Sequence, residues 1–327
     1  MFEELSVFAL GFAATFLSMP VVIQRMRKHR IVGVDVHKKD RPVIPEMGGI
    51  AVLLGLTVSV TVTAVLMPEK TGLLASFFAT TLIAGVIGAV DDIKTLNAKV
   101  KPLLTALASA PILLMRTYSP YPVFPIVGAV RLTIVYPLLI PFAIAVPSNA
   151  VNMMDPFNGT MSGTCTIVTL VLLFSSLILG RSDAALLSIC LLGPLLVFYY
   201  YNRYPAKVFS GDIGSLSIGA ALGAIAVLGQ LEAVAVVAFA PQIMNAFYGL
   251  ATVGRLYERR EVSRPVTMLG DGRLMASTDP KAPITLARVT LARGPLYECE
   301  AARVFMVLAS IAGVLAVLTA YLTMVTP

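Results

Sequence analysis

Long apolar stretches separated by short polar segments make up most of this 327-residue chain. A helix that crosses a membrane needs about 20 predominantly apolar residues. Ten stretches approach this length: 5–24, 48–67, 73–90, 103–118, 132–149, 161–180, 183–201, 213–230, 232–251 and 304–325. The pattern predicts an all-α, polytopic integral membrane protein with about ten transmembrane helices. We expect residues 1–327 to form one transmembrane domain, and an even number of spans places both termini on the same side.

The composition agrees with a chain that is solvated largely by lipid. Apolar residues make up 57% of the chain, and its mean hydropathy is +0.85. Charged residues make up 13%, whereas a soluble domain carries about 25%. The first apolar stretch begins with Glu3 and Glu4 rather than with a basic segment, so we interpret it as a retained span and not as a signal peptide.

The basic residues are distributed unevenly between two sets of loops. Four segments contain 21 of the 25 lysines and arginines: 25–46, 91–102, 200–212 and 254–303. Because cytoplasmic loops are enriched in Lys and Arg, these segments are predicted to be cytoplasmic and both termini to face outward. This bias toward basic residues in one set of loops explains the net charge of +7. We therefore exclude nucleic-acid binding as the reason for the charge. The expected location is the cell membrane, or the endoplasmic reticulum membrane in a eukaryote.

Two adjacent acidic residues, Asp91 and Asp92, end the third apolar stretch. An acidic residue at the centre of a span costs about 2.5–3.5 kcal/mol to insert, so a pair at its border needs a reason. One interpretation is an ordinary span terminus. Lys94, Lys99 and Lys101 follow the pair. The other interpretation is therefore a site where carboxylates bind a cation or accept a proton and lysine neutralises phosphate.

A run of carbonyl-bearing side chains lies in SNAVNMMDPFNGTMSG at 148–163. At intervals of three residues it contains Asn149, Asn152, Asp155 and Asn158. The first three share one face of a helical end, Pro156 disfavours a helix through Asp155, and Gly159 permits a tight turn. Helix caps and turn formers account for two of the four residues, whereas a ligand-binding site accounts for all of them.

Asp212 begins a stretch of small residues, GDIGSLSIGAALG at 211–223. An acidic residue at a helix start is a common cap, and it is also a candidate ligand of Mg²⁺. Phe209, just upstream, is a candidate for stacking on a base. Gly219 and Gly223 indicate close helix packing.

The last cytoplasmic segment, 254–303, is a candidate substrate-recognition loop. Its arginines cluster early: Arg255, Arg259, Arg260, Arg264 and Arg273. Positive-inside bias explains part of this cluster, and the remainder suits diphosphate, because guanidinium groups bind phosphate oxygens in pairs. The chain has only two histidines and no spacing typical of a zinc site. Oxygen ligands without His or Cys favour Mg²⁺, or Mn²⁺, as the cofactor.

Four motifs occur together in the order found in a known family. They are PEMGG at 45–49, DD at 91–92 with Lys101 beyond, NAVNMMDPFNG at 149–159 and FSGDIGSLSIG at 209–219. In order, spacing and predicted cytoplasmic placement, the chain resembles the polyprenyl-phosphate N-acetylhexosamine-1-phosphate transferases. The resemblance runs through most of the chain and implies a ten-span membrane enzyme that uses Mg²⁺.

Two branches of that family share features with this chain. PQIMNAFY at 241–248 is similar to the eukaryotic and archaeal branch, which moves GlcNAc-1-phosphate from UDP-GlcNAc to dolichyl phosphate. GDIGSLSIGAALG is more similar to the bacterial branch, whose peptidoglycan enzyme has a His-rich motif in its last cytoplasmic loop; this chain has no histidine after His37. The mixture favours an archaeal UDP-GlcNAc–dolichyl-phosphate GlcNAc-1-phosphotransferase. Its products are GlcNAc-PP-dolichol and UMP, early in protein N-glycosylation.

The resemblance also implies roles for individual residues. Asp212 and Asn152 would bind Mg²⁺ or the diphosphate, and Asp91 would act as a base toward the lipid phosphate, supported by Asp92. Lys101 and Asn149 would contact phosphates, and Phe209, Asn158 and Gly159 would hold the uracil. Arg264 would recognise the sugar, and Asp155 would bind substrate within the same site. Direct attack and a covalent aspartyl intermediate both stay open, and so does a homodimer.

Two other functions also stay open. A bacterial-type transferase would use undecaprenyl phosphate for cell-envelope glycans. A lipid-linked-sugar flippase or transporter would share the spans and the basic cytoplasmic face. Transporters, however, usually place polar residues at mid-membrane depth, often with inverted repeats and broken helices. Here the polar motifs follow the ends of apolar stretches and no such symmetry is visible, which favours an enzyme.

Overall fold

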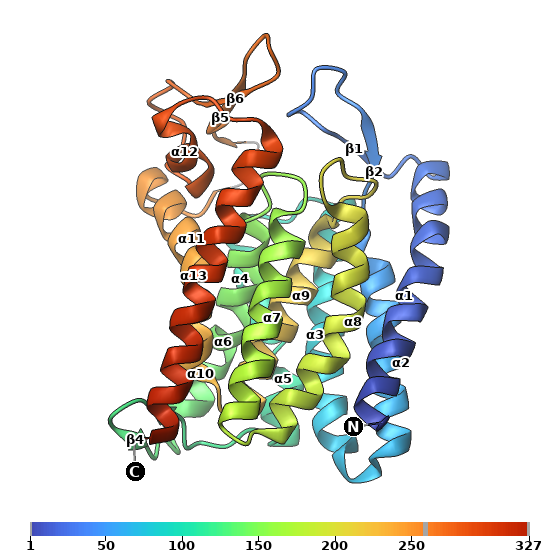
Figure 1. Ribbon diagram of the computed structural model, residues 1–327, viewed down its shortest axis with the longest axis vertical. Helices are drawn as coiled ribbons and strands as arrows, with labels where there is room; N and C mark the ends of the chain where they lie inside the picture. The colour runs from blue at the N-terminus through green and yellow to red at the C-terminus, as the bar shows by residue number, and fades with distance from the viewer. Residues whose placement is uncertain (1, 258–260, 326–327) are drawn as a thin grey trace.

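The computed structural model describes residues 2–257 and 261–325 as a bundle of roughly aligned helices (Figure 1). Eight described helices are long and apolar enough to cross a membrane. They are α1 (Phe2–Lys28), α2 (Gly49–Leu66), α3 (Thr71–Ile93), α6 (Val135–Met153), α7 (Thr160–Ile178), α8 (Ser182–Asn202), α9 (Gly211–Leu228) and α13 (Glu298–Val325). Each corresponds to a predicted span, so the expectation of an all-α polytopic membrane protein is confirmed.

The predicted span 232–251 is a bent pair of helices. α10 (Glu232–Ala238) and α11 (Ala240–Val253) meet at an angle of 64°. Pro241 lies in the first turn of α11. Because proline has no N–H to donate to the preceding turn, a continuous helix is broken at this point.

The predicted span 103–118 is also interrupted. It consists of α4 (Val100–Leu107) and α5 (Ala110–Met115), with Pro111 in the first turn of α5. The ten predicted spans therefore become eight long helices, one bent pair and one short pair in the part of the chain that the structure describes. The interruption at α4–α5 is important because α4 carries a lysine of the site described below.

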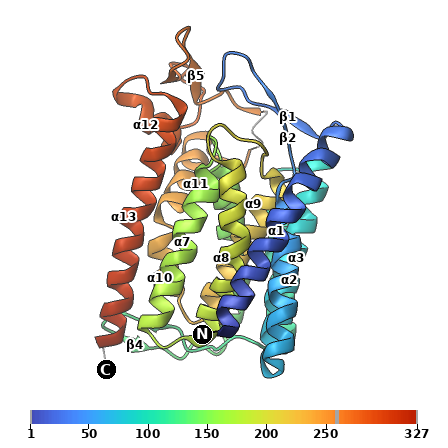
Figure 2. The same cartoon turned by 45° about the vertical axis from the view of Figure 1, so that its right-hand side comes forward.

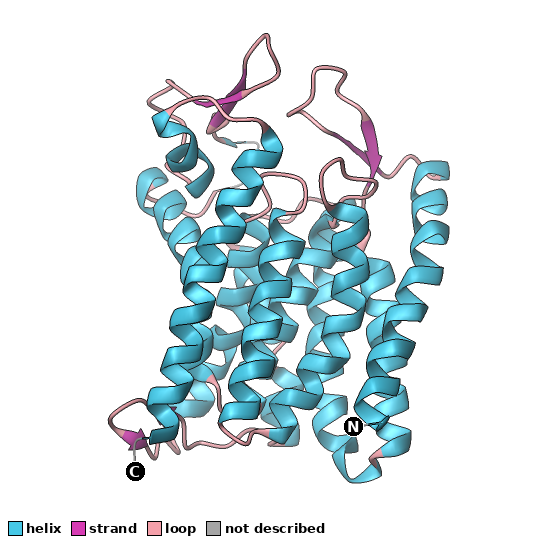
Figure 3. Ribbon diagram, in the orientation of Figure 1, coloured by secondary structure: helices cyan, strands magenta, loops and turns pink. Residues whose placement is uncertain are grey.

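The two ends of the bundle differ in structure (Figures 1 and 2). Helix α1 begins and α13 ends at the same end of the bundle, and the hairpin of β3 (Val123–Phe124) and β4 (Gly128–Ala129) lies beside the end of α13. The opposite end carries two further antiparallel hairpins and a short helix, as Figure 3 shows. These elements are β1 (Val32–Val34), β2 (Val43–Pro45), β5 (Val266–Met268), β6 (Leu274–Ala276) and α12 (Leu286–Thr290). The long loops predicted to be cytoplasmic therefore gather at one end.

Large apolar side chains cover the outside of the bundle. On α13, for example, Val307, Ile311, Val314 and Leu318 are exposed at intervals of three or four residues. A continuous apolar face of this kind is unfavourable in water but is well solvated by lipid. The exposed faces therefore agree with the membrane placement that the sequence predicts.

Helix α9 lies in the middle of the bundle, and every residue from Ile213 to Leu228 is buried. Its glycines allow neighbouring backbones to approach closely. A Cβ on Gly219 would lie 2.6 Å from the carbonyl oxygen of Pro147 in α6, and a Cβ on Gly214 would lie 3.1 Å from Cα of Gly49 in α2. The predicted role of Gly219 in helix packing is thus confirmed. These contacts fix the position of the end of α9 that carries Asp212.

Gly88 of α3 also allows a close approach to the backbone of α9. A Cβ at Gly88 would overlap the carbonyl oxygen of Asp212. We therefore expect Gly88→Ala to push α3 and α9 apart and to destabilise the protein by about 1–3 kcal/mol, measured as a lower Tm in detergent. Gly72→Ala in the same helix is the matched control, because nothing lies within 4 Å of its Cβ. If Gly88→Ala and Gly72→Ala had the same Tm, the close contact between α3 and α9 at Gly88 would be contradicted.

Candidate active site

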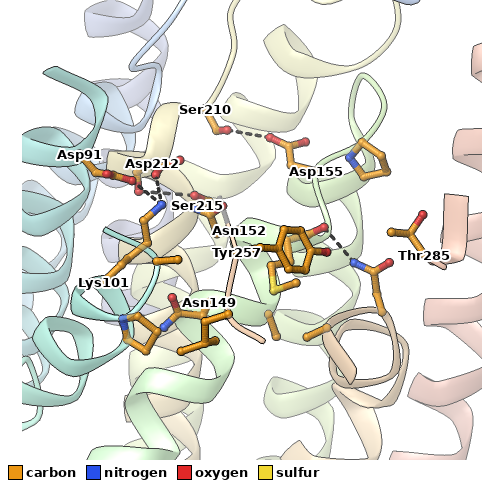
Figure 4. A pocket seen from close by; sticks show the side chains of 18 of the residues that line it. Asp91, Lys101, Asn149, Asn152, Asp155, Ser210, Asp212, Ser215, Tyr257 and Thr285 are labelled. Carbon is orange, nitrogen blue, oxygen red and sulfur yellow. Dashed lines mark hydrogen bonds and ion pairs between the residues drawn. The ribbon is translucent and has the colours of Figure 1, made fainter. Parts of the chain in front are cut away.

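An ion-pair cluster joins the ends of α3, α4 and α9 (Figure 4). Lys101, in the first turn of α4, pairs with Asp91 of α3, and its Nζ lies 2.6 Å from Oδ2 of Asp212 in α9. The side chain of Asp91 is buried, whereas that of Asp212 is 28% exposed. Two carboxylates around one ammonium leave an excess negative charge, which favours a further cation beside them. The structure thus brings together three residues that were predicted from separate motifs.

Asp92 points to a different partner from its neighbour Asp91. Its Oδ1 accepts a hydrogen bond from the backbone N–H of Asp212 at 2.7 Å, and its Oδ2 accepts one from Ile213 at 3.0 Å. These are N–H groups of the first turn of α9, which a carboxylate stabilises both by hydrogen bonding and through the helix dipole. Gly211, with φ of +64°, leaves room for this carboxylate, since a Cβ there would lie 2.6 Å from Oδ2. Asp92 therefore holds the segment that carries Asp212.

Three predicted residues lie along the cavity side of α6 and the turn that follows it (Figure 4). Asn149 donates from Nδ2 to Oγ1 of Thr105 in α4 at 2.8 Å. Asp155, beyond the end of α6, accepts a hydrogen bond from Oγ of Ser210 at 2.8 Å. Asn152 lies between them along the chain, and its buried Nδ2 has no hydrogen-bond partner among the described residues. The predicted common face of these side chains is therefore present.

The donor groups around Lys101 suit Mg²⁺ or Mn²⁺. Asp91 and Asp212 offer carboxylate oxygens, and Asn152 offers an amide in the same cavity. Hard cations prefer such oxygen donors. The amide oxygen of Asn152 is the atom that could bind the cation, whereas its orphaned Nδ2 is a donor that requires an acceptor such as a phosphate oxygen. The residues present thus fit the cation that the sequence predicts.

Phe209 lies on another wall of the same cavity and is half-buried. Its backbone pairs with the PEMGG motif: its N–H donates to Pro45 at 2.8 Å, and its carbonyl accepts from Gly48 at 2.8 Å. A Cβ on Gly33 would lie 3.2 Å from the Phe209 ring. Two motifs that are far apart in the sequence therefore position this ring on the cavity wall, where a base that enters the cavity could stack on it.

Asn158 and Gly159, both predicted to contact uracil, have different surroundings in the structure. Asn158 lines the cavity, but its side-chain amide donates to Oδ2 of Asp35 at 3.0 Å. Gly159 has φ of +81° at the start of α7, and a Cβ there would lie 3.0 Å from Cα of Arg203. The geometry thus gives Gly159 a backbone role, in agreement with the tight turn predicted for it.

The arginines of the last loop separate into groups. Arg255 pairs with Glu261 at 3.1 Å and Arg273 with Asp271 at 2.7 Å, both at the surface. Arg264 lines the cavity. Arg259 and Arg260 lie outside the described residues. Among the described arginines of the predicted cluster, Arg264 is therefore the one best placed to reach a bound substrate.

One cavity of about 1420 Å³ is lined by most of the predicted site residues, although not by Gly159. These lining residues are Asp91, Asp92, Lys101, Asn149, Asn152, Asp155, Asn158, Phe209, Asp212 and Arg264. Beyond the polar cluster the cavity continues into an apolar arm between α4–α5, α6 and α11. Its walls there include Leu103, Leu107, Leu113, Phe142, Val146, Phe247 and Leu250. A polar chamber that opens into an apolar groove can hold a molecule with a charged end and a hydrocarbon chain.

The structure also adds lining residues that the sequence reasoning missed. Tyr257 projects into the cavity from the loop after α11, and Thr285 lies on the far wall (Figure 4). Burial raises the pKa of the Tyr257 phenol, so the hydroxyl stays protonated and can donate a hydrogen bond at neutral pH. Neither residue belongs to a motif. The only sequence signal was their position in the loop predicted to recognise substrate.

Comparisons with known proteins show which family the chain resembles. The profile of glycosyl transferase family 4 matches residues 74–230. A Saccharolobus solfataricus protein, provisionally named a UDP-N-acetylglucosamine–dolichyl-phosphate N-acetylglucosaminephosphotransferase, is 28% identical over 246 residues, covering 74% of this chain and 76% of that protein. A provisionally named glycosyltransferase of Methanocaldococcus jannaschii is 30% identical over 290 residues, covering 88% and 87%. The phospho-N-acetylmuramoyl-pentapeptide-transferase of Shouchella clausii is 32% identical over 246 residues, covering 70% and 75%.

Proposed function

Because the chain belongs to glycosyl transferase family 4, we propose that it transfers GlcNAc-1-phosphate from UDP-GlcNAc to dolichyl phosphate or another polyprenyl phosphate. The products would be GlcNAc-PP-dolichol and UMP, in an early step of protein N-glycosylation. The observation that carries the proposal is the cluster of Asp91, Lys101 and Asp212, placed where a polar chamber meets an apolar arm. The names of the archaeal relatives support the choice of sugar and acceptor.

In the proposed reaction, an oxygen of the polyprenyl phosphate attacks the β-phosphorus of UDP-GlcNAc. The bond from that phosphorus to the bridging oxygen breaks, and UMP leaves with the electron pair. In this proposal Asp91 accepts the proton of a singly protonated lipid phosphate, and Lys101 neutralises the charge of a phosphate oxygen. Mg²⁺ or Mn²⁺, when bound by Asp212 and Asn152, would neutralise the diphosphate. Positioning and charge stabilisation are the main sources of acceleration in phosphoryl transfer.

The apolar arm supports a polyprenyl acceptor. Its walls come from α4–α5, α6 and α11, and Leu107, Phe142 and Phe247 are exposed along it. An isoprenoid chain laid against them would keep its phosphate at the polar end of the cavity, beside Lys101. We place the reaction at the cytoplasmic face, because 21 of the 25 basic residues lie in the loops at this end. The loop 254–303 would then cover the sugar.

The second candidate is a bacterial-type transfer to undecaprenyl phosphate. Proteins named phospho-N-acetylmuramoyl-pentapeptide-transferases match this chain at identities similar to those of the archaeal proteins. The absence of histidine after His37 favours the GlcNAc substrate by the resemblance stated above. The two candidates differ in sugar and acceptor and are separated by the same assay.

The test uses purified protein, Mg²⁺ and labelled UDP-GlcNAc with either dolichyl or undecaprenyl phosphate. The proposal requires label in the organic-extractable lipid, an equal amount of UMP, and loss of both on adding EDTA. A preference for dolichyl phosphate would select the first candidate. No product with either lipid from any UDP-HexNAc would reject both transferase functions and leave transport as the alternative.

Phe209→Ala is expected to weaken the binding of the nucleotide. Stacking of a base on an aromatic ring is worth about 1–3 kcal/mol, which corresponds to a KM for UDP-GlcNAc at least about fivefold higher. The acceptor KM should change little. Phe209→Tyr keeps the ring and should behave like the wild type, whereas Phe247→Ala in the apolar arm should raise only the acceptor KM. An unchanged KM for UDP-GlcNAc in Phe209→Ala would remove the ring from the base site.

A further inference from the structure

A second buried polar cluster, which we call the Lys38 network, borders the same cavity through Asp35 and Asn158. It consists of Asp35, Lys38, Asn158 and Glu298. Lys38 forms an ion pair with Asp35, and its Nζ lies 3.2 Å from Oε2 of Glu298. The Lys38 ammonium also lies over the ring of Tyr204, 4.8 Å from its centroid.

Asn158 connects both acidic residues of the network. Its side-chain amide donates to Oδ2 of Asp35 at 3.0 Å, and its backbone N–H donates to Oε1 of Glu298 at 2.9 Å. Asp35 and Glu298 are 4% exposed and Asn158 is 7% exposed. Hydrogen bonds to charged, buried groups are among the stronger ones in proteins. The network therefore joins the loop before α2, the turn before α7 and the first turn of α13.

The same cluster contains a set of residues that could in principle hold a metal. Ligand atoms of Asp35, His37 and Glu298 all lie within 4.8 Å of one another. The ammonium of Lys38, however, already contacts both carboxylates. A cation placed there would have to displace this lysine, because the side chains of Asp35 and Glu298 are only 3% exposed. The side chain of Asp212 beside Lys101, by contrast, is 28% exposed and can offer an oxygen to a second cation. We therefore interpret the cluster as a connection between segments and not as a metal centre.

The connected loop forms a wall of the cavity on the side of Phe209. Gly33, Asp35 and His37 all line the cavity. Gly33 lies against the Phe209 ring, and the ring of His37 lies 5.4 Å from that of Phe157. A movement of this loop would therefore open the space beside the ring on which a base would stack.

We infer that Lys38 and Glu298 are positioning residues that hold the loop 32–38 against the turn 155–159 and so complete the binding pocket for a uridine nucleotide. The inference rests on the proposed function for the identity of the nucleotide. Neither residue needs to touch the reacting atoms. If breaking the network leaves the loop closed only about a tenth of the time, the apparent Kd for the nucleotide rises about tenfold.

The experiment measures UDP binding by calorimetry and hydrogen–deuterium exchange of the amides of 32–38 in the full-length protein. We expect Lys38→Met to weaken UDP binding about tenfold and to speed exchange in the loop. Lys38→Arg should restore much of both, because it retains the charge. Lys39→Met is the matched control, since Lys39 is the neighbouring lysine and is exposed. It should leave both measurements unchanged.

Glu298→Gln is the second variant. Glutamine can still accept the N–H of Asn158 but no longer offers a negative charge to Lys38, so the loop should loosen while the turn before α7 stays ordered. Faster exchange with unchanged UDP binding would overturn the positioning role, and unchanged exchange in both variants would overturn the network itself. A wild-type protein that binds UDP but transfers no sugar phosphate would reject the proposed function and leave this inference intact.

Discussion

Replacing Asp212 by asparagine is expected to lower kcat by about a thousandfold without unfolding the protein. Asparagine has nearly the same size, and the backbone N–H of residue 212 can still donate to Asp92, as it does at 2.7 Å. The change removes the excess negative charge of the cluster, because Lys101 would then face only one carboxylate. Binding of a divalent cation beside the diphosphate should weaken for the same reason. The measurement is UMP release at saturating substrates over a Mg²⁺ titration.

Asp271→Asn is the control for this prediction. Asp271 pairs with Arg273 on the surface of the last loop, so its replacement changes the net charge equally and leaves the cluster untouched. Its kcat should match that of the wild type. Turnover of Asp212→Asn close to the wild-type value, at an unchanged Mg²⁺ requirement and an unchanged Tm, would remove Asp212 from the metal site and from the reaction.

The membrane architecture could be predicted because it depends on local composition. A stretch of apolar residues either can or cannot span a bilayer, and eight predicted spans appear as long helices. The interruptions were harder to predict. Pro20 lies inside the continuous helix α1, whereas Pro111 and Pro241 lie where a helix starts again. Hydropathy alone does not distinguish these cases, because the result depends on whether neighbouring helices support the next turn.

For the candidate site, the sequence predicted the residues that belong to motifs but not the contacts that each of them makes. Asn149, Asn152 and Asp155 were expected on one face because of their spacing, and all three line the cavity. Only the family resemblance assigned different roles to the adjacent Asp91 and Asp92, with Asp91 as the base and Asp92 in support. Successive side chains on a helix point about 100° away from each other, and the residues alone do not show which partner each one meets. In the structure one contacts Lys101 and the other caps α9.

The Lys38 network could not be predicted from the sequence. Lys38 and Glu298 are 260 positions apart in the chain, and neither forms part of a recognisable spacing with the other. In a charged loop, one lysine among several looks like ordinary positive-inside bias. Only the fold, which brings the first turn of α13 over the loop before α2, distinguishes Lys38 from its exposed neighbour Lys39. Such pairs of distant charged residues are poorly predicted from one sequence.

Lys101→Met is expected to have the second large effect, on both transfer and stability. The ammonium lies between two carboxylates, and its loss leaves them unpaired in a partly buried place. Removing one partner of a buried pair costs about 3–5 kcal/mol, and the remaining exposure of this cluster should reduce that figure. Transfer should fall by about a hundredfold or more, because a phosphate oxygen loses its cationic partner. The measurements are Tm in detergent and initial rates, with Lys99→Met, at an exposed lysine in the same segment, as control.

The double variant Asp91→Asn with Lys101→Met separates these two effects. Asparagine at position 91 removes the repulsion between carboxylates, so the Tm should return toward the wild-type value. Activity should stay low, because neither the ammonium nor the carboxylate at position 91 is present. Recovery of activity together with stability would show that Lys101 acts only in folding. Recovery of stability alone would show that the charges meeting at the ends of α3, α4 and α9 act on the substrate, since the same helices would then be assembled without the reaction.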